Sequence, residues 1–162
     1  KVKEIIESGT IGNVVNVQVR FSVPPRDLDF QSGKEMPWRL QPDIAGGGYF
    51  YDLAPHQIDL LQNLFGVITR AHGYPANRAH LYQAEDTLSA CFFFESGIPG
   101  SGSWCFVGHE SAKEDCIEVI GDKGSLSFSV FTLILPQIIS PVLRLNLRIC
   151  AGDTYTSLLP GI

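Results

Sequence analysis

The segment GGGYFYDLAPHQIDLLQNLFG, residues 46–66, is the starting point for the fold expected of this chain. Its apolar residues recur at helical spacing and Gly66 ends the pattern, so the sequence predicts a helix over residues 52–65. Proline is tolerated in the first turn of a helix, and Pro55 therefore places Asp52 at the N-cap or in a distorted first turn. The three glycines either form a tight turn or let backbone approach other backbone or a ligand closely.

Asp52, His56 and Asp59 are spaced i, i+4 and i+7, so they share one helical face, roughly opposite the apolar one. A histidine one turn into a helix and beside a carboxylate is well placed to act as a general base near neutral pH. Other interpretations stay open. Asp52 can be a helix cap, His56 an ordinary surface or core residue, and Asp59 a partner for nearby backbone or for His56. Asp and His one turn apart can also bind a divalent cation.

The sequence before this helix predicts three features. Residues 1–8 form an amphipathic helix with Gly9 as its C-cap. Residues 14–23 alternate as a strand with one polar face, and the apolar face carries Val15, Val17, Val19 and Phe21. Residues 26–45 form a long polar loop that holds Trp38 and Arg39, and loops of this length in compact domains are usually functional or disordered.

After the helix the pattern changes to strands with short turns. The expected strands cover residues 67–75, 86–94 and 99–107, followed by a hairpin within residues 116–130 that turns at GDKG. Residues 131–162 have no clear period and form either one or two further strands or a poorly ordered tail. The chain is therefore expected to be a single α+β domain over residues 1–162, with an open, largely antiparallel mixed sheet and helices packed on one face.

Composition narrows the classes of function. The chain is 44% hydrophobic and 18% charged, with a formal net charge of −5 and no basic patch, which argues against a nucleic-acid partner. It has no apolar run of about 18 residues, the length needed to span a bilayer, and its charged N-terminus does not read as a signal peptide. Four widely spaced cysteines favour reduced thiols and a cytoplasmic protein.

Residues 46–66 resemble the G-G-G-x-x-x-D-x-x-x-H-x-x-D signature of the C-terminal domain of the glucose–fructose oxidoreductase, inositol dehydrogenase and rhizopine-catabolism family (Gfo/Idh/MocA). Three further stretches are similar to the exit helix and first strand, the loop before the catalytic helix, and the late hairpin of that family: IIESGTIGNVVNVQVRF, PWRLQPDIAGGG and IEVIGDKGSLSF. The resemblance covers residues 1 to about 130, whereas residues 131–162 depart from the usual ending of the family.

The resemblance implies a function. In this family an N-terminal Rossmann domain binds NAD or NADP, and the second domain supplies the substrate site and the oligomer interface. His56 is then the general base that takes a proton from a sugar or cyclitol hydroxyl, and Asp52 orients the substrate or the histidine. Arg39, Trp38 and Asp59 are the substrate-binding candidates.

The chain contains neither G-x-G-x-x-G nor the Glu-Lys-Pro motif of the family. It is therefore expected to be the C-terminal domain of a longer NAD- or NADP-dependent oxidoreductase, with no cofactor bound to this fragment. The expected partners are a sugar or polyol substrate and further copies of the chain, in a homodimer or tetramer formed through the open sheet face. The alternative is a non-catalytic ligand-binding or dimerisation module of the same fold.

Overall fold

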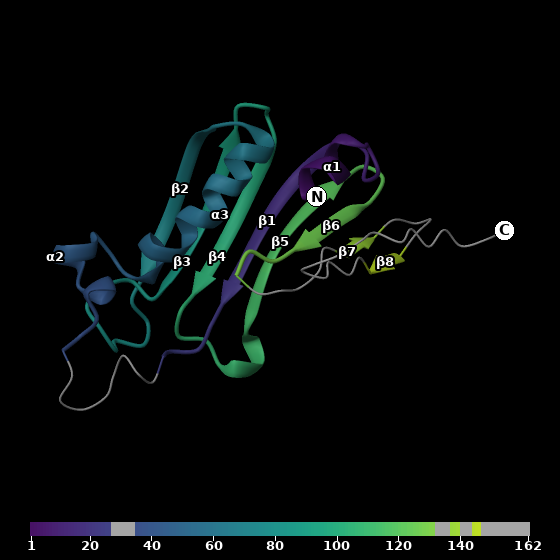
Figure 1. Ribbon diagram of the computed structural model, residues 1–162. Helices are drawn as coiled ribbons and strands as arrows, with labels where there is room; N and C mark the ends of the chain where they lie inside the picture. The colour runs from purple at the N-terminus through teal and green to yellow at the C-terminus, as the bar shows by residue number, and fades with distance from the viewer. Residues whose placement is uncertain (27–34, 132–136, 140–143, 147–162) are drawn as a thin grey trace.

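The computed structural model describes residues 1–26, 35–131, 137–139 and 144–146. Its elements follow one another as a short helix, a strand, a helical segment and then a run of strands (Figure 1). In order they are α1 Val2–Glu7, β1 Val14–Ser22, η2 Trp38–Leu40, α2 Pro42–Ala45, α3 Tyr49–Phe65, β2 Ile68–Ala76, β3 Thr87–Phe94, β4 Pro99–Cys105, η3 Glu110–Ala112, β5 Glu114–Gly121, β6 Ser125–Phe128, β7 Gln137–Ile139 and β8 Arg144–Asn146.

The described strands form one open sheet in the order β2-β3-β4-β1-β5-β6-β7-β8. Strand β1 lies in the middle and runs parallel to β4, while the other pairings are antiparallel. Helix α3 lies along one face of the sheet, beside β3 and β4 (Figure 1). The expected α+β fold with an open, largely antiparallel mixed sheet is confirmed. No helix in the described part of the chain has the length and apolar character needed to span a bilayer.

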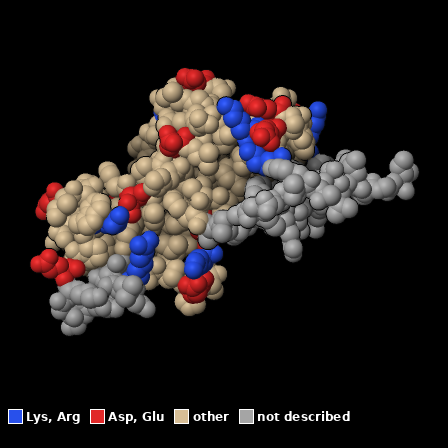
Figure 2. Space-filling view, viewed as in Figure 1, with Lys and Arg blue, Asp and Glu red and all other residues tan. Residues whose placement is uncertain are grey.

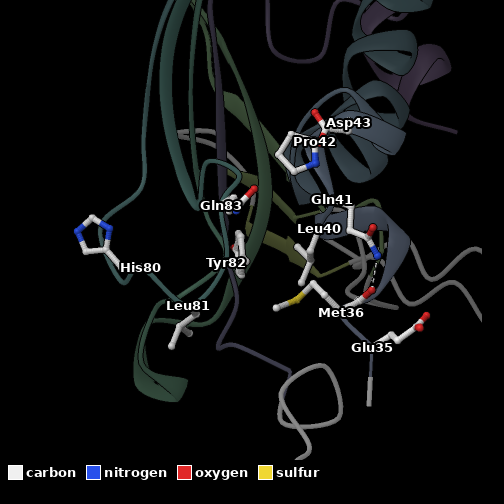
Figure 3. Close-up of a pocket in the computed structure, with 10 residues that line it drawn as sticks. All are labelled: Glu35, Met36, Leu40, Gln41, Pro42, Asp43, His80, Leu81, Tyr82 and Gln83. Atoms are coloured by element: carbon white, nitrogen blue, oxygen red, sulfur yellow. Dashed lines mark hydrogen bonds between the residues drawn. The ribbon is translucent and has the colours of Figure 1, made fainter. Parts of the chain in front are cut away.

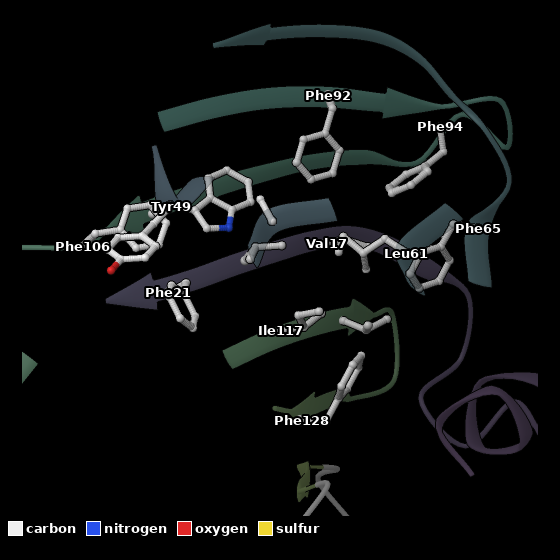
Figure 4. Packing of buried hydrophobic residues seen from close by; sticks show 14 of the residues in the cluster. Val17, Phe21, Tyr49, Leu61, Phe65, Phe92, Phe94, Phe106, Ile117 and Phe128 are labelled. Atoms are coloured by element: carbon white, nitrogen blue, oxygen red, sulfur yellow. The ribbon is translucent and has the colours of Figure 1, made fainter. Parts of the chain in front are cut away.

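The hydrophobic core joins buried residues of α3, such as Leu61 and Phe65, with buried residues of the sheet from β3 across to β6 (Figure 4). In β1 the core side chains are Val17, Val19 and Phe21, each at most 5% exposed. Val15, expected on the same face, is 48% exposed, so that part of the prediction is wrong. The register of β1 against β5 shifts between Val14 and Asn16, and this irregularity breaks the alternation at Val15.

Helix α3 begins three residues earlier than expected. Gly48 is its N-cap, and Pro55 lies in the second turn rather than the first. Pro55 has no backbone N–H and therefore cannot donate a hydrogen bond to the carbonyl of Tyr51. Both residues are exposed, so water can hydrate that carbonyl. The expectation that Asp52 is the N-cap is therefore wrong, whereas the alternative that Asp52 lies in the first turn is confirmed.

The predicted loop over residues 26–45 contains two short helical segments, η2 and α2, within its described part. Residues 27–34 of this prediction lie outside the described residues. The C-cap of α1 is Ser8, one residue before the expected Gly9, which has a φ of +71°. For residues 131–162 the sequence left two alternatives, further strands or a poorly ordered tail. Strands β7 and β8 lie in this segment, and the rest of residues 132–162 lies outside the described residues.

Candidate functional site

The three glycines at 46–48 connect α2 to α3 and press against the segment before β3. Gly46 ends α2 in the left-handed region, with a φ of +82°. A Cβ on Gly48 would lie 2.5 Å from the backbone oxygen of Glu85, and a Cβ on Gly47 would lie 2.3 Å from the ring of Tyr51. The glycines therefore serve close packing within the chain, which is one of the two roles that the sequence leaves open.

Glu85 also holds the start of α3. Its Oε1 accepts a hydrogen bond from the backbone N–H of Gly48 at 2.9 Å. A carboxylate at this position is favourable because the N-terminus of a helix carries partial positive charge. Glu85 lies 37 residues from Gly48, so no local sequence signal indicates the contact, and the sequence analysis missed this residue.

Helix α3 is fastened to the sheet by a buried polar contact as well as by apolar packing. Gln57 is fully buried, and its Oε1 accepts a hydrogen bond of 2.7 Å from the indole Nε1 of Trp104 on β4. The indole in turn lies over Gly102, where a Cβ would come within 2.1 Å of the ring. This contact limits how far α3 can rotate about its axis. Because His56 is the residue before Gln57, the contact also limits where His56 can lie.

Asp52 and Arg39 form an ion pair at the exposed side of α3. The Nε–H of Arg39 donates to Oδ2 of Asp52 at 2.9 Å, with side chains 43% and 33% exposed respectively. The guanidinium of Arg39 also lies over the indole of Trp38, 4.5 Å from its ring centroid. Three of the five predicted site residues are therefore in one connected group.

His56 lies one turn beyond Asp52 on α3 and is exposed. Its imidazole packs edge-on against Phe131, with ring centroids 6.0 Å apart. Phe131 is held by Asp115, which accepts its backbone N–H at 2.6 Å and is itself 8% exposed. Phe131 is 75 positions along the chain from His56, so sequence spacing could not indicate that the two rings meet.

Asp59 is exposed on the same face of α3. A helix rises about 1.5 Å per residue, so Asp59 lies about 10 Å along the axis from Asp52 but only one turn from His56. The predicted face of Asp52, His56 and Asp59 is thus present. Within the described residues, no three His, Cys, Asp or Glu side chains form a group that could hold a metal ion.

A separate hollow of about 770 Å³ lies between residues 35–43 and residues 80–83 (Figure 3). Leu40 and Tyr82 lie at its buried side, and burial raises the pKa of the Tyr82 phenol. The residues that line this hollow do not include Asp52 or His56. It borders the segment that carries Arg39 but is distinct from the Asp52–His56 face.

Charge on the molecule is mixed. Figure 2 shows Lys and Arg side chains interspersed with Asp and Glu on the face in view. Of the four cysteines, Cys91, Cys105 and Cys116 are free thiols, and Cys150 lies outside the described residues. Burial raises the pKa of the Cys116 thiol, although the neighbouring Arg20 acts in the opposite direction.

Comparison with known proteins agrees with this fold. A sequence profile described as GFO/IDH/MocA C-terminal domain matches residues 1–127. The chain is 35% identical over 132 residues to "Oxidoreductase P35" of Formosa agariphila, a match that covers 82% of this chain and 40% of that protein. The chain thus spans about 40% of the length of this curated relative.

Two solved structures are similar to this chain. One is a levoglucosan dehydrogenase in complex with NADH and levoglucosan, with a TM-score of 0.71 and 24% identity, covering 84% of this chain and 38% of that one. The other is the WlbA dehydrogenase from Bordetella pertussis in complex with NADH and UDP-GlcNAcA, with a TM-score of 0.66 and 28% identity, covering 78% and 38%. With the profile match over residues 1–127, this chain belongs to the GFO/IDH/MocA family, as a C-terminal domain.

Proposed function

We propose that this domain supplies the substrate site of an NAD- or NADP-dependent oxidoreductase that acts on a CH–OH group of a sugar, polyol or cyclitol. The observation that carries the proposal is the exposed face of α3, where Asp52, paired with Arg39 at 2.9 Å, lies one turn before the exposed His56. A carboxylate and an imidazole at this spacing can bind and deprotonate the same alcohol.

In the proposed reaction the imidazole of His56 accepts the proton of the substrate hydroxyl. The C–H hydrogen of the same carbon leaves as a hydride, and the alcohol becomes a carbonyl. A bound nicotinamide supplies the hydride acceptor. Asp52 accepts a hydrogen bond from the substrate or from His56 and thereby orients the reacting hydroxyl. Trp38, at 52% exposure, and Asp59 are proposed to line the cleft around the sugar.

The glycines of this chain do not fit a cofactor phosphate. The space beside Gly47 is filled by the ring of Tyr51, and the N–H of Gly48 is taken by the carboxylate of Glu85. A dinucleotide site needs glycines that let the pyrophosphate approach the backbone, and free N–H groups at the start of a helix. A carboxylate at that position would repel the pyrophosphate. We therefore place no cofactor contact on residues 46–48.

The relatives support the substrate class. Two of the similar structures are complexes of NADH with levoglucosan or with UDP-GlcNAcA, which are both carbohydrate derivatives. A third, from Desulfitobacterium hafniense, is described as a putative NADPH-dependent oxidoreductase, at 27% identity and a TM-score of 0.66. These proteins differ in cofactor and in sugar, so the proposal names the class of substrate and leaves the cofactor as NAD or NADP.

We also propose that the open face of the sheet forms a homodimer or tetramer interface. The face opposite α3 carries a shallow groove of about 560 Å³, whose lining includes His72, Tyr74 and Ser103. Tyr74 is 71% exposed, and a large aromatic in that position is typical of surfaces that become buried on association. Sedimentation velocity should show a dimer or larger species for the unmodified protein and a monomer for Tyr74→Glu. A monomer for the unmodified protein would contradict the proposed interface.

The catalytic proposal is tested with the full-length protein that carries this domain. A panel of sugars, polyols and cyclitols is incubated with NAD or NADP, and reduction of the nicotinamide is followed by absorbance. At least one member of the panel should be oxidised, and Asp52→Ala should slow that reaction while cofactor binding is retained. A protein that binds the cofactor but oxidises no member of the panel contradicts the proposal and favours the non-catalytic ligand-binding module.

A further inference from the structure

We infer that Arg39 is a positioning residue that holds the Asp52 carboxylate in place for His56, and that it is not itself a ligand of the substrate. This inference rests on the proposed function of the Asp52–His56 face. It differs from the role that the family resemblance implies for Arg39, which is substrate binding; the sequence places Arg39 in a long loop and gives no partner for it.

The first observation is the way Arg39 is held. Its Nε–H is engaged by Oδ2 of Asp52 at 2.9 Å, and one side of its guanidinium is stacked at 4.5 Å from the centroid of the Trp38 ring. A planar guanidinium that is stacked on an indole and bonded to a carboxylate has a defined orientation. It can therefore fix the position of the carboxylate to which it is bonded.

The second observation is the rigidity of the segment that carries Arg39. The next residue, Leu40, is 1% exposed and anchors η2 in the core. The backbone N–H groups of Leu40 and Gln41 donate to the carbonyls of Pro37 and Trp38 at 2.9 and 3.1 Å. Arg39 thus projects from a turn whose backbone is held in place. A residue that binds substrates of different shape would instead need a backbone that can move.

The third observation is the path of the chain between the two residues. Arg39 and Asp52 are 13 positions apart. The left-handed Gly46 and the packing of Gly48 against Glu85 turn the chain back, so that η2 lies beside the first turn of α3. The close glycine packing therefore determines where Arg39 meets Asp52.

The fourth argument concerns energetics. Both side chains of the pair are about one-third or more exposed, at 43% and 33%. Exposed ion pairs add little to folding stability because water screens them and ordering two long side chains costs entropy. Removing Arg39 should therefore show its effect in turnover and leave the unfolding transition nearly unchanged.

The test is a double-mutant cycle in the full-length enzyme with Arg39→Gln, Asp52→Ala and the double variant. A small misplacement of a catalytic group can cost up to about 100-fold in rate, so Arg39→Gln should lower kcat by roughly 10- to 100-fold with little change in KM. Arg39→Lys keeps the charge and should restore part of the loss. The double variant should be no slower than Asp52→Ala alone, because Arg39 acts only through that carboxylate.

The matched control is Arg70→Gln. Arg70 lies on the edge strand β2, and its guanidinium also lies over an aromatic ring, that of Phe93 on β3 at 4.9 Å. This control should retain full kcat. If the losses of Arg39→Gln and Asp52→Ala multiply in the double variant, or if Arg39→Gln raises only KM, the inference is overturned and Arg39 contacts the substrate. Retained turnover in His56→Ala would instead overturn the proposed function, so the two failures are distinguishable.

Discussion

The ring of Phe131 packs edge-on against the imidazole of His56, with centroids 6.0 Å apart. Asp115 holds Phe131 in this position, because its carboxylate accepts hydrogen bonds from the backbone N–H groups of Val130 and Phe131. The candidate base is thus supported by a residue that lies just beyond β6 in the chain.

Phe131→Ala should lower kcat/KM of the full-length enzyme by up to about tenfold, since an edge-on aromatic pair contributes roughly 0.5–1.5 kcal/mol and the imidazole loses its support. Phe93→Ala is the matched control, because both phenylalanines are 40% exposed but Phe93 lies on β3, away from His56. Equal losses in the two variants would show that Phe131 has no specific effect on His56.

Gly48→Ala should destabilise the domain by about 1–3 kcal/mol, the usual cost of overpacking. The added Cβ would meet backbone, the carbonyl of Glu85, which cannot rotate away as a side chain can. Urea unfolding followed by circular dichroism measures the change. Gly73→Ala serves as the comparison, since a Cβ there meets neighbours only at 3.5 Å or more; a Gly48→Ala midpoint like that of Gly73→Ala would refute the packing argument.

The helix could be predicted from the apolar spacing of residues 52–65, but its start could not. Pro55 indicated a first turn, and the helix instead extends back to Tyr49 because Gly48 is capped by Glu85. A contact over 37 positions overrides the local preference of proline. The strands were likewise predictable from alternation, whereas the parallel pairing of β1 with β4 was not, because alternation carries no information about partners.

Trp104→Phe and Gln57→Leu should each destabilise the domain by roughly 1–3 kcal/mol, because either change leaves a buried polar group of the other residue without its hydrogen bond. The double variant should be more stable than the sum of the two losses predicts. Urea unfolding of all four proteins gives the coupling energy, and strict additivity would mean that the 2.7 Å contact contributes nothing.

Asp122 ties the turn after α1 to the hairpin of β5 and β6. Hydrogen bonds from the side chain and backbone N–H of Asn13 lower the pKa of its carboxyl. A lowered pKa in the folded state stabilises the fold above the unfolded-state pKa of about 3.9, and this contribution is lost as the pH falls through the folded-state value.

Asp122→Asn should therefore be less stable than the unmodified protein at neutral pH, and the gap should close below about pH 4. Urea midpoints measured from neutral to acidic pH give the comparison. A difference between the two proteins that is constant across this range would contradict the assignment of the pKa shift to the Asn13 contacts.

The composition of the candidate site was partly predictable. The i, i+4, i+7 spacing correctly placed Asp52, His56 and Asp59 on one helical face. The partners that position these side chains come from η2 and from the end of β6, at separations that local periodicity does not reach. Arg39 was identified only as part of a long loop, and the contact of Phe131 with His56 depends on how the sheet brings β1 and β6 toward α3.

The proposed role of His56, which is to accept the proton of the substrate hydroxyl, is tested most directly by His56→Ala in the full-length protein with imidazole added back. We expect kcat to fall by roughly 10²- to 10⁴-fold, NAD or NADP to bind as before, and free imidazole to restore turnover in proportion to its concentration. His109→Ala, at the exposed N-cap residue of η3, should keep full activity. Undiminished turnover in His56→Ala would show that His56 is not the base.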